Sequence, residues 1–215
     1  MTQTLKAIYR EGAFIPKTPC DLPEGVEVEL TINAPHILPP KVTDPEERKR
    51  ILEVVRTAAI VHRQAPDVRF TIVGAHEDGA AAVRDEVTRL DIGTAVDLRG
   101  RVAAEEKRAL MTSAAVYFQP TLYEAFGVAM AEAMACGAPV LSNAVGAVPE
   151  VVGDCGVLLP SGSTPEAYAD ALVKLLHDPH RERLGERGRE RVNREFSHRA
   201  RRRVVEEALA VVRGR

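Results

Sequence analysis

Two glutamates mark the segment of this sequence whose residue types could do chemistry. Glu124 and Glu132 are separated by seven residues, and Phe126 and Gly127 lie between them. The segment follows an apolar run that ends at Pro120, and it opens an alanine-rich stretch that we expect to be a helix. Free N–H groups at a helix N-terminus favour an anion, and a glycine lets a phosphate approach the backbone closely. The pattern therefore predicts a site for a phosphate-bearing ligand.

Glu132 is flanked by Ala131, Ala133, Met134 and Ala135, so we expect it in a mainly apolar helix. A carboxylate there needs a hydrogen-bonding partner to offset its desolvation, and the hydroxyls of a ligand are good donors. Taken alone, a glutamate in such a helix more often faces solvent, and a glycine near a helix start more often eases packing. Both glutamates together with a glycine at a strand end favour a binding site instead.

The elements that must position these residues alternate between strand and helix over about 115 residues, as in βαβ units. The strands are continuous apolar runs, which is typical of a parallel sheet covered on both faces. The pattern predicts an α/β fold with a Rossmann-like doubly wound parallel sheet, which binds ligands at the carboxyl ends of its strands. The expected strands are residues 68–74, 96–100, 114–119, 139–142 and 156–159. The first expected helix begins at about residue 45 and ends before Pro66, and further helices are expected over 83–90, 105–112 and 126–136.

The N-terminal part follows a different pattern, because seven of the fourteen prolines lie in the first 45 residues. Residues 5–10 and 13–15 read as two strands around the turn Glu11-Gly12, and residues 26–32 alternate as a half-buried strand does. The sequence thus predicts three parts. They are a small β segment over 1–34, a proline-rich linker over 35–44, and an α/β domain over 45–215.

Composition excludes several classes of protein. The chain is 45% apolar and 28% charged with a net charge of −2, which argues against disorder. Its cysteines, Cys20, Cys136 and Cys155, are too scattered for a disulfide framework or a zinc knuckle. Apolar runs of the length of a signal peptide or a membrane span are absent. We expect a cytoplasmic protein with no metal site and no transmembrane segment.

The last 35 residues carry a local excess of positive charge, with twelve arginines against six acids from Arg181 to Arg215. A basic tail raises the possibility of nucleic-acid binding. Its arginines alternate with glutamates at helical spacings, however, and aromatic residues are not interleaved with them. We therefore favour a solvated helical face, expect no nucleic-acid partner, and rate that reading lowest among the alternatives.

The segment Glu124-Ala-Phe-Gly127, followed by Glu132-Ala-Met-Ala-Cys-Gly137-Ala-Pro-Val, resembles the two-glutamate signature of family 4 glycosyltransferases of the GT-B fold. The segments 66–74, 96–102, 146–150, 154–160 and 195–197 match the same family in the expected order. The resemblance runs from about Pro45 to the end of the chain. It implies the C-terminal, donor-binding half of a retaining enzyme that transfers a hexosyl group from a nucleoside-diphosphate sugar and uses no metal or other cofactor.

The resemblance also implies roles for individual residues. Glu124 is the expected catalytic residue, in contact with the donor sugar, and Glu132 is expected to contact the ribose hydroxyls. Their work would be positioning and electrostatic stabilisation of the departing nucleoside diphosphate, rather than acid and nucleophile chemistry. The full donor-binding set is Phe126, Gly127, Val128, Glu132, Arg101, Val102, Gly74, Lys41 and Lys49.

The sequence differs from the family in two features, the residues that would bind the diphosphate and the acceptor domain. Lys41 and Lys49 stand where the family has a phosphate-binding arginine and lysine, and Pro40 and Arg50 replace the neighbouring glycines. A lysine binds phosphate as a point charge and lacks the bidentate fork of arginine. The acceptor domain that precedes this half in the family is not expected here, so we expect transfer to need a separate acceptor domain.

Residues 1–34 resemble short β-rich proteins grouped with prokaryotic antitoxins, which suggests a fusion or a truncated gene with a foreign start. Exposed strands of such a segment could pair with a partner chain. The alternative to a glycosyltransferase half is therefore a non-catalytic interaction protein of toxin–antitoxin type, in which the α/β part is a degraded passenger.

Overall fold

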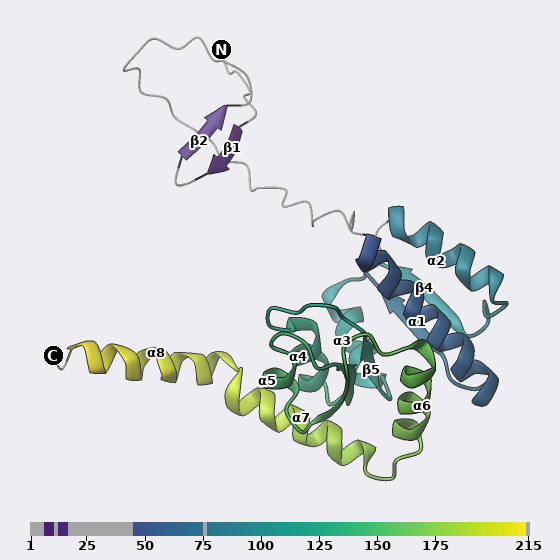
Figure 1. Cartoon of the computed structure of the whole chain (residues 1–215). Helices are drawn as coiled ribbons and strands as arrows, with labels where there is room; N and C mark the ends of the chain where they lie inside the picture. Colours follow the sequence, from purple (N-terminus) through teal and green to yellow (C-terminus); the bar gives the residue numbers. More distant parts are fainter. Residues whose placement is uncertain (1–6, 11–12, 17–44, 75–76, 214–215) are drawn as a thin grey trace. The chain divides into compact units, whose positions relative to one another are not determined.

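The computed structural model describes residues 7–10, 13–16, 45–74 and 77–213 (Figure 1). Side chains are described for residues 50–74, 80–207 and 209. Its contacts divide the chain into two compact units, residues 1–39 and 40–215. In the first unit, β1 (Ala7–Arg10) pairs antiparallel with β2 (Ala13–Pro16), and Ile8 lies opposite Ile15. The predicted hairpin is thereby confirmed. Its turn, the predicted strand 26–32 and the linker lie outside the described residues.

The second unit is an α/β fold whose described strands are all parallel to their neighbours, as the sequence predicts. β3 (Phe70–Val73) pairs with β4 (Val96–Gly100). β6 (Val140–Asn143) lies between β5 (Tyr117–Gln119) and β7 (Gly156–Leu159). All four residues of β6 are buried, which explains its unbroken apolar start.

Helices separate these strands in the chain. The structure gives them as α1 (Pro45–Gln64), α2 (Glu77–Arg89), α3 (Ala104–Ser113), α4 (Val128–Ala135), α5 (Val148–Val152), α6 (Pro165–Leu176), α7 (Arg181–Glu195) and α8 (His198–Arg213). In Figure 1 α1 lies beside α2 and α6, and buried side chains of α1 join two hydrophobic clusters. One cluster covers β3 and β4, and the other also takes in β5, β6 and α6.

Three predicted boundaries are wrong. The strand expected over 114–119 begins only at Tyr117, since Ala114 is the residue that ends α3. The helix expected over 83–90 begins six residues earlier, at Glu77. The helix expected from Phe126 begins at Val128, because Gly127 has a φ of 88° and the left-handed conformation cannot continue as a right-handed helix.

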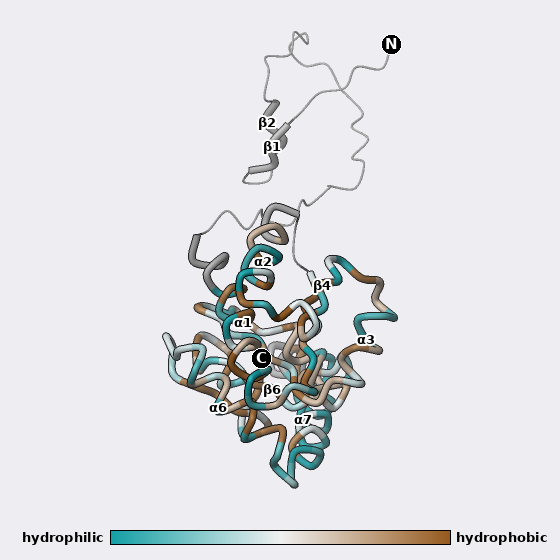
Figure 2. The backbone as a smooth tube through the Cα atoms, turned by 90° about the vertical axis from the view of Figure 1, so that its right-hand side faces the viewer, coloured by the Kyte–Doolittle hydropathy of each residue, from teal (hydrophilic) through white to brown (hydrophobic). Residues whose placement is uncertain are grey.

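α4 is the apolar helix beneath the predicted site. Met130, Ala131, Ala133 and Met134 are buried, and Met134 packs with Val192 of α7. The hydropathy colouring of Figure 2 shows α7 itself as mainly hydrophilic, with the hydrophobic segments around β6. α7 covers α4 with the buried residues Gly185, Gly188 and Val192. Arg189 and Arg191 of α7 also donate hydrogen bonds to the backbone carbonyls of Cys136 at 2.9 Å and Val151 at 3.0 Å.

The C-terminal charges pair along the helices. Arg202 contacts Glu206 at 2.7 Å, and Arg191 contacts Glu195 at 3.1 Å, each one helical turn apart. Such pairs are typical of a solvated helical face. No helix in the part of the chain that the structure describes is both long and apolar enough to cross a bilayer.

Candidate functional site

The buried side chain of Asn143 holds the start of the loop between β5 and α4. The Asn143 side-chain carbonyl accepts a hydrogen bond from the Thr121 backbone N–H at 2.9 Å. Its amide nitrogen donates to the Pro160 carbonyl at 3.0 Å and to the Tyr168 hydroxyl at 2.5 Å. Asn143 is fully buried at the carboxyl end of β6, so these bonds satisfy a group that would otherwise be costly to bury. The loop thus leaves the sheet in one defined direction.

The Glu124 carboxylate closes this loop on itself. Its Oε1 accepts hydrogen bonds from the backbone N–H of Gly127 at 2.9 Å and of Phe126 at 3.3 Å. Gly127 is the N-cap of α4, so the carboxylate lies at the positive end of that helix. The backbone donors expected to face a ligand are therefore bonded to Glu124 in the structure.

The loop after β6 contacts the backbone of Glu124. The Glu124 carbonyl accepts a hydrogen bond from the Ala147 N–H at 3.0 Å. Gly146, with a φ of 51°, lies against the same carbonyl, and a Cβ at this position would collide with it. Only glycine allows the two loops to approach this closely, so Gly146 fixes where Glu124 stands.

Glu132 has a cationic partner from a different helix. Lys107 of α3 donates to both carboxylate oxygens, with Nζ–Oε distances of 2.9 and 2.8 Å. The side chains are 41% and 42% exposed, so the pair lies at the surface between α3 and α4. The sequence predicts that this carboxylate needs a hydrogen-bonding partner, and the structure supplies an ammonium group.

The negative charges of Glu124 and Glu132 both affect the pKa of Tyr117. Burial, and then the negative charges of Glu132 and Glu124, together raise its pKa to about 12. The Tyr117 hydroxyl donates to the Gln119 side chain at 2.7 Å. The two carboxylates therefore act electrostatically on one partly buried phenol.

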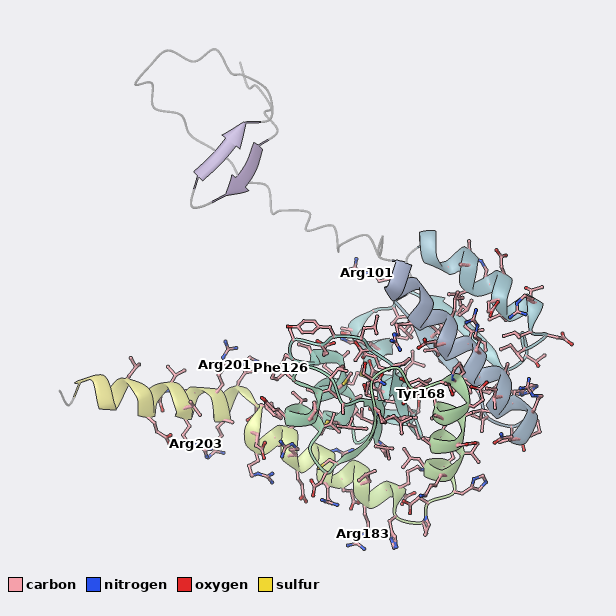
Figure 3. All side chains as sticks on the ribbon, in the orientation of Figure 1. Arg101, Phe126, Tyr168, Arg183, Arg201 and Arg203 are labelled. Atoms are coloured by element: carbon pink, nitrogen blue, oxygen red, sulfur yellow. The ribbon has the colours of Figure 1, made fainter. Side chains whose placement is uncertain are left out.

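Four further predicted residues follow the carboxyl ends of β3, β4 and β5 in the chain: Gly74, Arg101, Val102 and Phe126. Figure 3 labels Arg101 and Phe126. Gly74 follows β3, and its N–H bonds to the Gly100 carbonyl at 2.6 Å. Arg101, which is exposed, and Val102 lead into α3. The ring of Phe126 meets Phe196 edge-on with centroids 5.5 Å apart.

Three other predicted residues differ in how far the structure describes them. Val128 is 61% exposed at the first position of α4. Lys49 lies in α1, but its side chain is outside the description, and Lys41 lies outside the described residues altogether. Among residues whose side chains are described, no three His, Cys, Asp or Glu side chains are grouped so that they could hold a metal ion.

A hollow of about 360 Å³ lies between α3 and α4 and includes both members of the ion pair. Its lining combines Lys107, Arg108 and Glu132 with the apolar Met111 and Ala135. Of the predicted donor-binding residues, only Glu132 lines this hollow.

Sequence reasoning missed three residues that shape the site. Lys107 follows two glutamates in a charged helix, so its pattern indicates only an exposed surface. Asn143 could have been found, because a polar residue at the end of the apolar run 139–142 needs buried partners. Gly146 belongs to a segment that matches the family, yet only its contact with Glu124 reveals a role.

Two known families match parts of the chain. Residues 40–191 match the family described as Glycosyl transferases group 1, and residues 1–55 match a family described as AF2212-like. The alpha-maltose-1-phosphate synthase of Mycolicibacterium smegmatis is 36% identical over 157 residues, covering 67% of this chain and 41% of that protein.

Two solved structures share the fold. The sucrose-phosphate synthase of Thermosynechococcus elongatus is 33% identical, with a TM-score of 0.63 over 77% of this chain and 43% of that one. HepE of Anabaena, solved in complex with UDP-glucose, is 22% identical, with a TM-score of 0.63 over 74% and 44% of the two chains. This chain thus spans less than half the length of these proteins.

The first family match covers well over half of the chain and includes both glutamates, β5, α4 and the loop between these two elements. With the α/β fold and the site at the carboxyl ends of parallel strands, this protein belongs to the group 1 glycosyl transferases.

Proposed function

We propose that this chain is the nucleotide-sugar-binding half of a retaining glycosyltransferase, which transfers a hexosyl group from a nucleoside-diphosphate sugar to an acceptor. The arrangement of Glu124 and Glu132 around the N-terminus of α4 carries the proposal. Membership of the family supports it, and so does a structural neighbour that was solved with UDP-glucose.

In this proposal the ligand extends along the carboxyl ends of the strands. Glu124 is the catalytic residue and contacts the donor sugar, and Glu132 accepts hydrogen bonds from the ribose hydroxyls. The backbone of Phe126, Gly127 and Val128 faces the sugar or the diphosphate, since helix N-termini favour negative charge. The carboxylate of Glu124 must then share or yield the two N–H groups to which it is bonded.

The other predicted residues complete the donor site. Arg101 and Val102 lie beside the nucleotide base, and Gly74, whose missing Cβ faces open space, leaves room next to them. Lys41 and Lys49 hold the diphosphate as point charges. No resident metal or cofactor is part of the proposal.

The chemical step breaks the bond between the anomeric carbon and the diphosphate oxygen. The new bond joins that carbon to an acceptor hydroxyl with the same configuration, and the nucleoside diphosphate departs with the bonding electrons. The protein contributes orientation and stabilisation of the charge that develops on the leaving group. A separate acceptor domain supplies the other half of the reaction centre, and the reaction takes place in the cytoplasm.

Calorimetric titration of the full chain with UDP, GDP and ADP tests the donor site. We expect one of them to bind, and we expect Glu132→Ala to weaken it about tenfold because a hydrogen bond to a charged group is lost. Glu166→Ala, an exposed glutamate on α6, is the matched control and leaves binding unchanged. Binding of none of the three, or undiminished binding to Glu132→Ala, contradicts the proposed site.

A second role is favoured for the N-terminal unit by its AF2212-like match and its β1–β2 hairpin. We propose that residues 1–34 form an antitoxin-like β segment that binds a protein partner by pairing of strand edges, joined by the linker 35–44 to the donor-binding domain 45–215. Mixing a purified candidate partner with the full chain and with a chain lacking residues 1–34 tests this. The shortened chain is expected to lose the complex and to keep nucleotide binding, and a complex that survives the deletion contradicts the role.

A further inference from the structure

The loop between β5 and α4 is held at three places along its length. Hydrogen bonds hold its start at the Thr121 N–H and its middle at the Glu124 carbonyl. Tyr123, between these two points, is 77% exposed, so its side chain does little to fix the loop. The third contact is made at the α4 end of the loop by the ring of Phe126.

Phe126 packs against an aromatic ring from a distant part of the sequence. Its ring meets that of Phe196 edge-on, with centroids 5.5 Å apart and ring planes at 85° to one another. This is one of the two favourable geometries for an aromatic pair. In Figure 3 Phe126 lies beside the junction of α7 and α8, and Phe196 is the residue that ends α7. The pair thus joins the loop to the end of α7.

The ring of Phe196 is itself fixed by the core. It packs against the hydrophobic cluster that contains Met134 of α4 and Val192 of α7. The guanidinium carbon of Arg191 lies 5.8 Å from the centroid of the same ring, which is within the range of a cation–π contact. Phe196 is therefore a fixed point against which the loop can rest.

Arg191, in turn, is anchored to the end of α5. It donates hydrogen bonds to the Val151 carbonyl at 3.0 Å and to the Glu150 carbonyl at 2.6 Å. Carbonyls in the last turn of a helix have no partner within the helix, so the guanidinium satisfies both. Gly153, with a φ of 58°, makes room for it, because a Cβ there would lie only 3.0 Å from the guanidinium carbon. The support behind Phe196 thus extends across α7 and α5.

The position of Phe126 controls where α4 presents its free N–H groups. Phe126 directly precedes Gly127, the N-cap of α4. The N–H groups of the first helical turn have no partner within the helix and are available to an anion. Glycine restricts the path of the chain least of all residues, so the ring of Phe126 is what holds this path before a ligand binds. A loop that is already ordered lowers the cost of binding.

We infer that Phe196 is a positioning residue for the diphosphate of the donor: it fixes the ring of Phe126, which preorganises the N-terminus of α4 and strengthens the binding of the second phosphate. The inference rests on the proposed function and narrows it, because that function puts either the sugar or the diphosphate at this N-terminus. Phe196 lies beyond residues 40–191, which match the family.

The test measures how much the second phosphate adds to binding. Calorimetry compares whichever of UDP, GDP and ADP binds to the full chain with the corresponding monophosphate. We expect the unchanged chain to prefer the diphosphate by about tenfold, from hydrogen bonds to a charged group. Phe196→Leu, which keeps an apolar side chain in the cluster, and Phe126→Leu are each expected to lower this preference about fivefold, the effect of one aromatic pair. Phe196→Tyr, which keeps the ring, is expected to retain the preference.

A chain that carries both Phe126→Leu and Phe196→Leu shows whether the two rings act through one another. If they do, the double variant loses no more of the diphosphate preference than either single variant. Losses that add in the double variant contradict the inference.

Phe70→Leu is the matched control, because Phe70 is a partly buried phenylalanine at the start of β3 and packs in other clusters. We expect it to lower the melting temperature as Phe196→Leu does and to leave the diphosphate preference unchanged. An unaltered preference in Phe196→Leu, or an equal loss in Phe70→Leu, overturns the inference and leaves the donor site standing. Equal binding of monophosphate and diphosphate to the unchanged chain does the same. No binding of any nucleotide overturns the proposed function, and the inference with it.

Discussion

The loop between β5 and α4 and the face between α3 and α4 each hold one carboxylate of the site, and they hold it differently. Glu124 in the loop accepts hydrogen bonds from N–H groups two and three residues further along the chain. Glu132 on the α3–α4 face is held by Lys107, which is 25 residues away in sequence. The first arrangement follows from the local turn, and the second exists only once two helices have packed.

This difference separates what each carboxylate contributes. Glu124 stabilises its own loop, because its partners are backbone groups at the start of α4 that need an acceptor. Glu132 contributes little to the free energy of unfolding, because its ion pair with Lys107 is exposed to solvent. We therefore expect changes in the loop to affect both folding and binding, and changes on the α3–α4 face to affect binding almost alone.

The largest effect on the free energy of unfolding is expected from Gly146→Ala. This change disturbs the loop that holds Glu124 and does not touch the α3–α4 face. The added Cβ collides with the Glu124 carbonyl, and the φ of 51° is unfavourable for alanine. We expect a loss of about 2–4 kcal/mol in the free energy of unfolding, measured by urea denaturation.

Gly162→Ala is the control for Gly146→Ala. It has a φ of 79°, but a Cβ there meets nothing within 4 Å, so only backbone strain of about 1 kcal/mol is added. Equal losses in the two variants would show that the contact with Glu124 has no effect of its own.

A smaller effect is expected when each of the two glutamates is replaced by alanine and the free energies of unfolding are compared. Glu124→Ala removes the acceptor of two backbone N–H groups, and we expect it to lower the free energy of unfolding by about 1 kcal/mol. Glu132→Ala loses an exposed ion pair and gains helix propensity, so a change of about 0–0.5 kcal/mol is expected. Thermal unfolding of both variants measures the difference, and a larger loss in Glu132→Ala would contradict it.

The smallest effect concerns Tyr117, whose pKa both carboxylates raise. Replacing Glu132 by glutamine is expected to lower the Tyr117 pKa from about 12 by more than the same change at Glu124, because the Glu132 charge has the larger influence. Ultraviolet titration of the phenolate measures this, with Tyr117→Phe as the reference that removes the signal. A larger shift in Glu124→Gln would reverse the order that we assign to the two charges.

The same phenol makes stability depend on alkaline pH. The folded-state pKa of about 12 lies above the ordinary value of 10.0, so the folded state holds this proton more tightly than the unfolded state. Its contribution to stability is fully present below pH 10 and is lost as the pH rises toward about 12. Tyr117→Phe is expected to lose less stability than the unchanged chain over this interval, as denaturant titration at each pH would show.

Much of the fold follows from the sequence, because continuous apolar runs alternate with helical periods and this combination favours parallel strands. Four of the five strands in the α/β unit lie within about two residues of the predicted ranges, which is the usual precision of such boundaries. The start of α4 was misplaced because apolar periodicity does not reveal a left-handed glycine. Phe126 fits the helical pattern, yet the conformation of Gly127 excludes it from the helix.

The sequence by itself determined which residues could form the site, since Glu124, Gly127 and Glu132 stand in one continuous segment with a spacing set by one loop and little more than one helical turn. Only the tertiary structure decided how those groups are held. The contacts from Lys107, Gly146 and Asn143 come from other elements of the fold. Hydrogen bonds and close approaches between distant segments depend on the packing of whole helices and loops, and local residue patterns do not encode them.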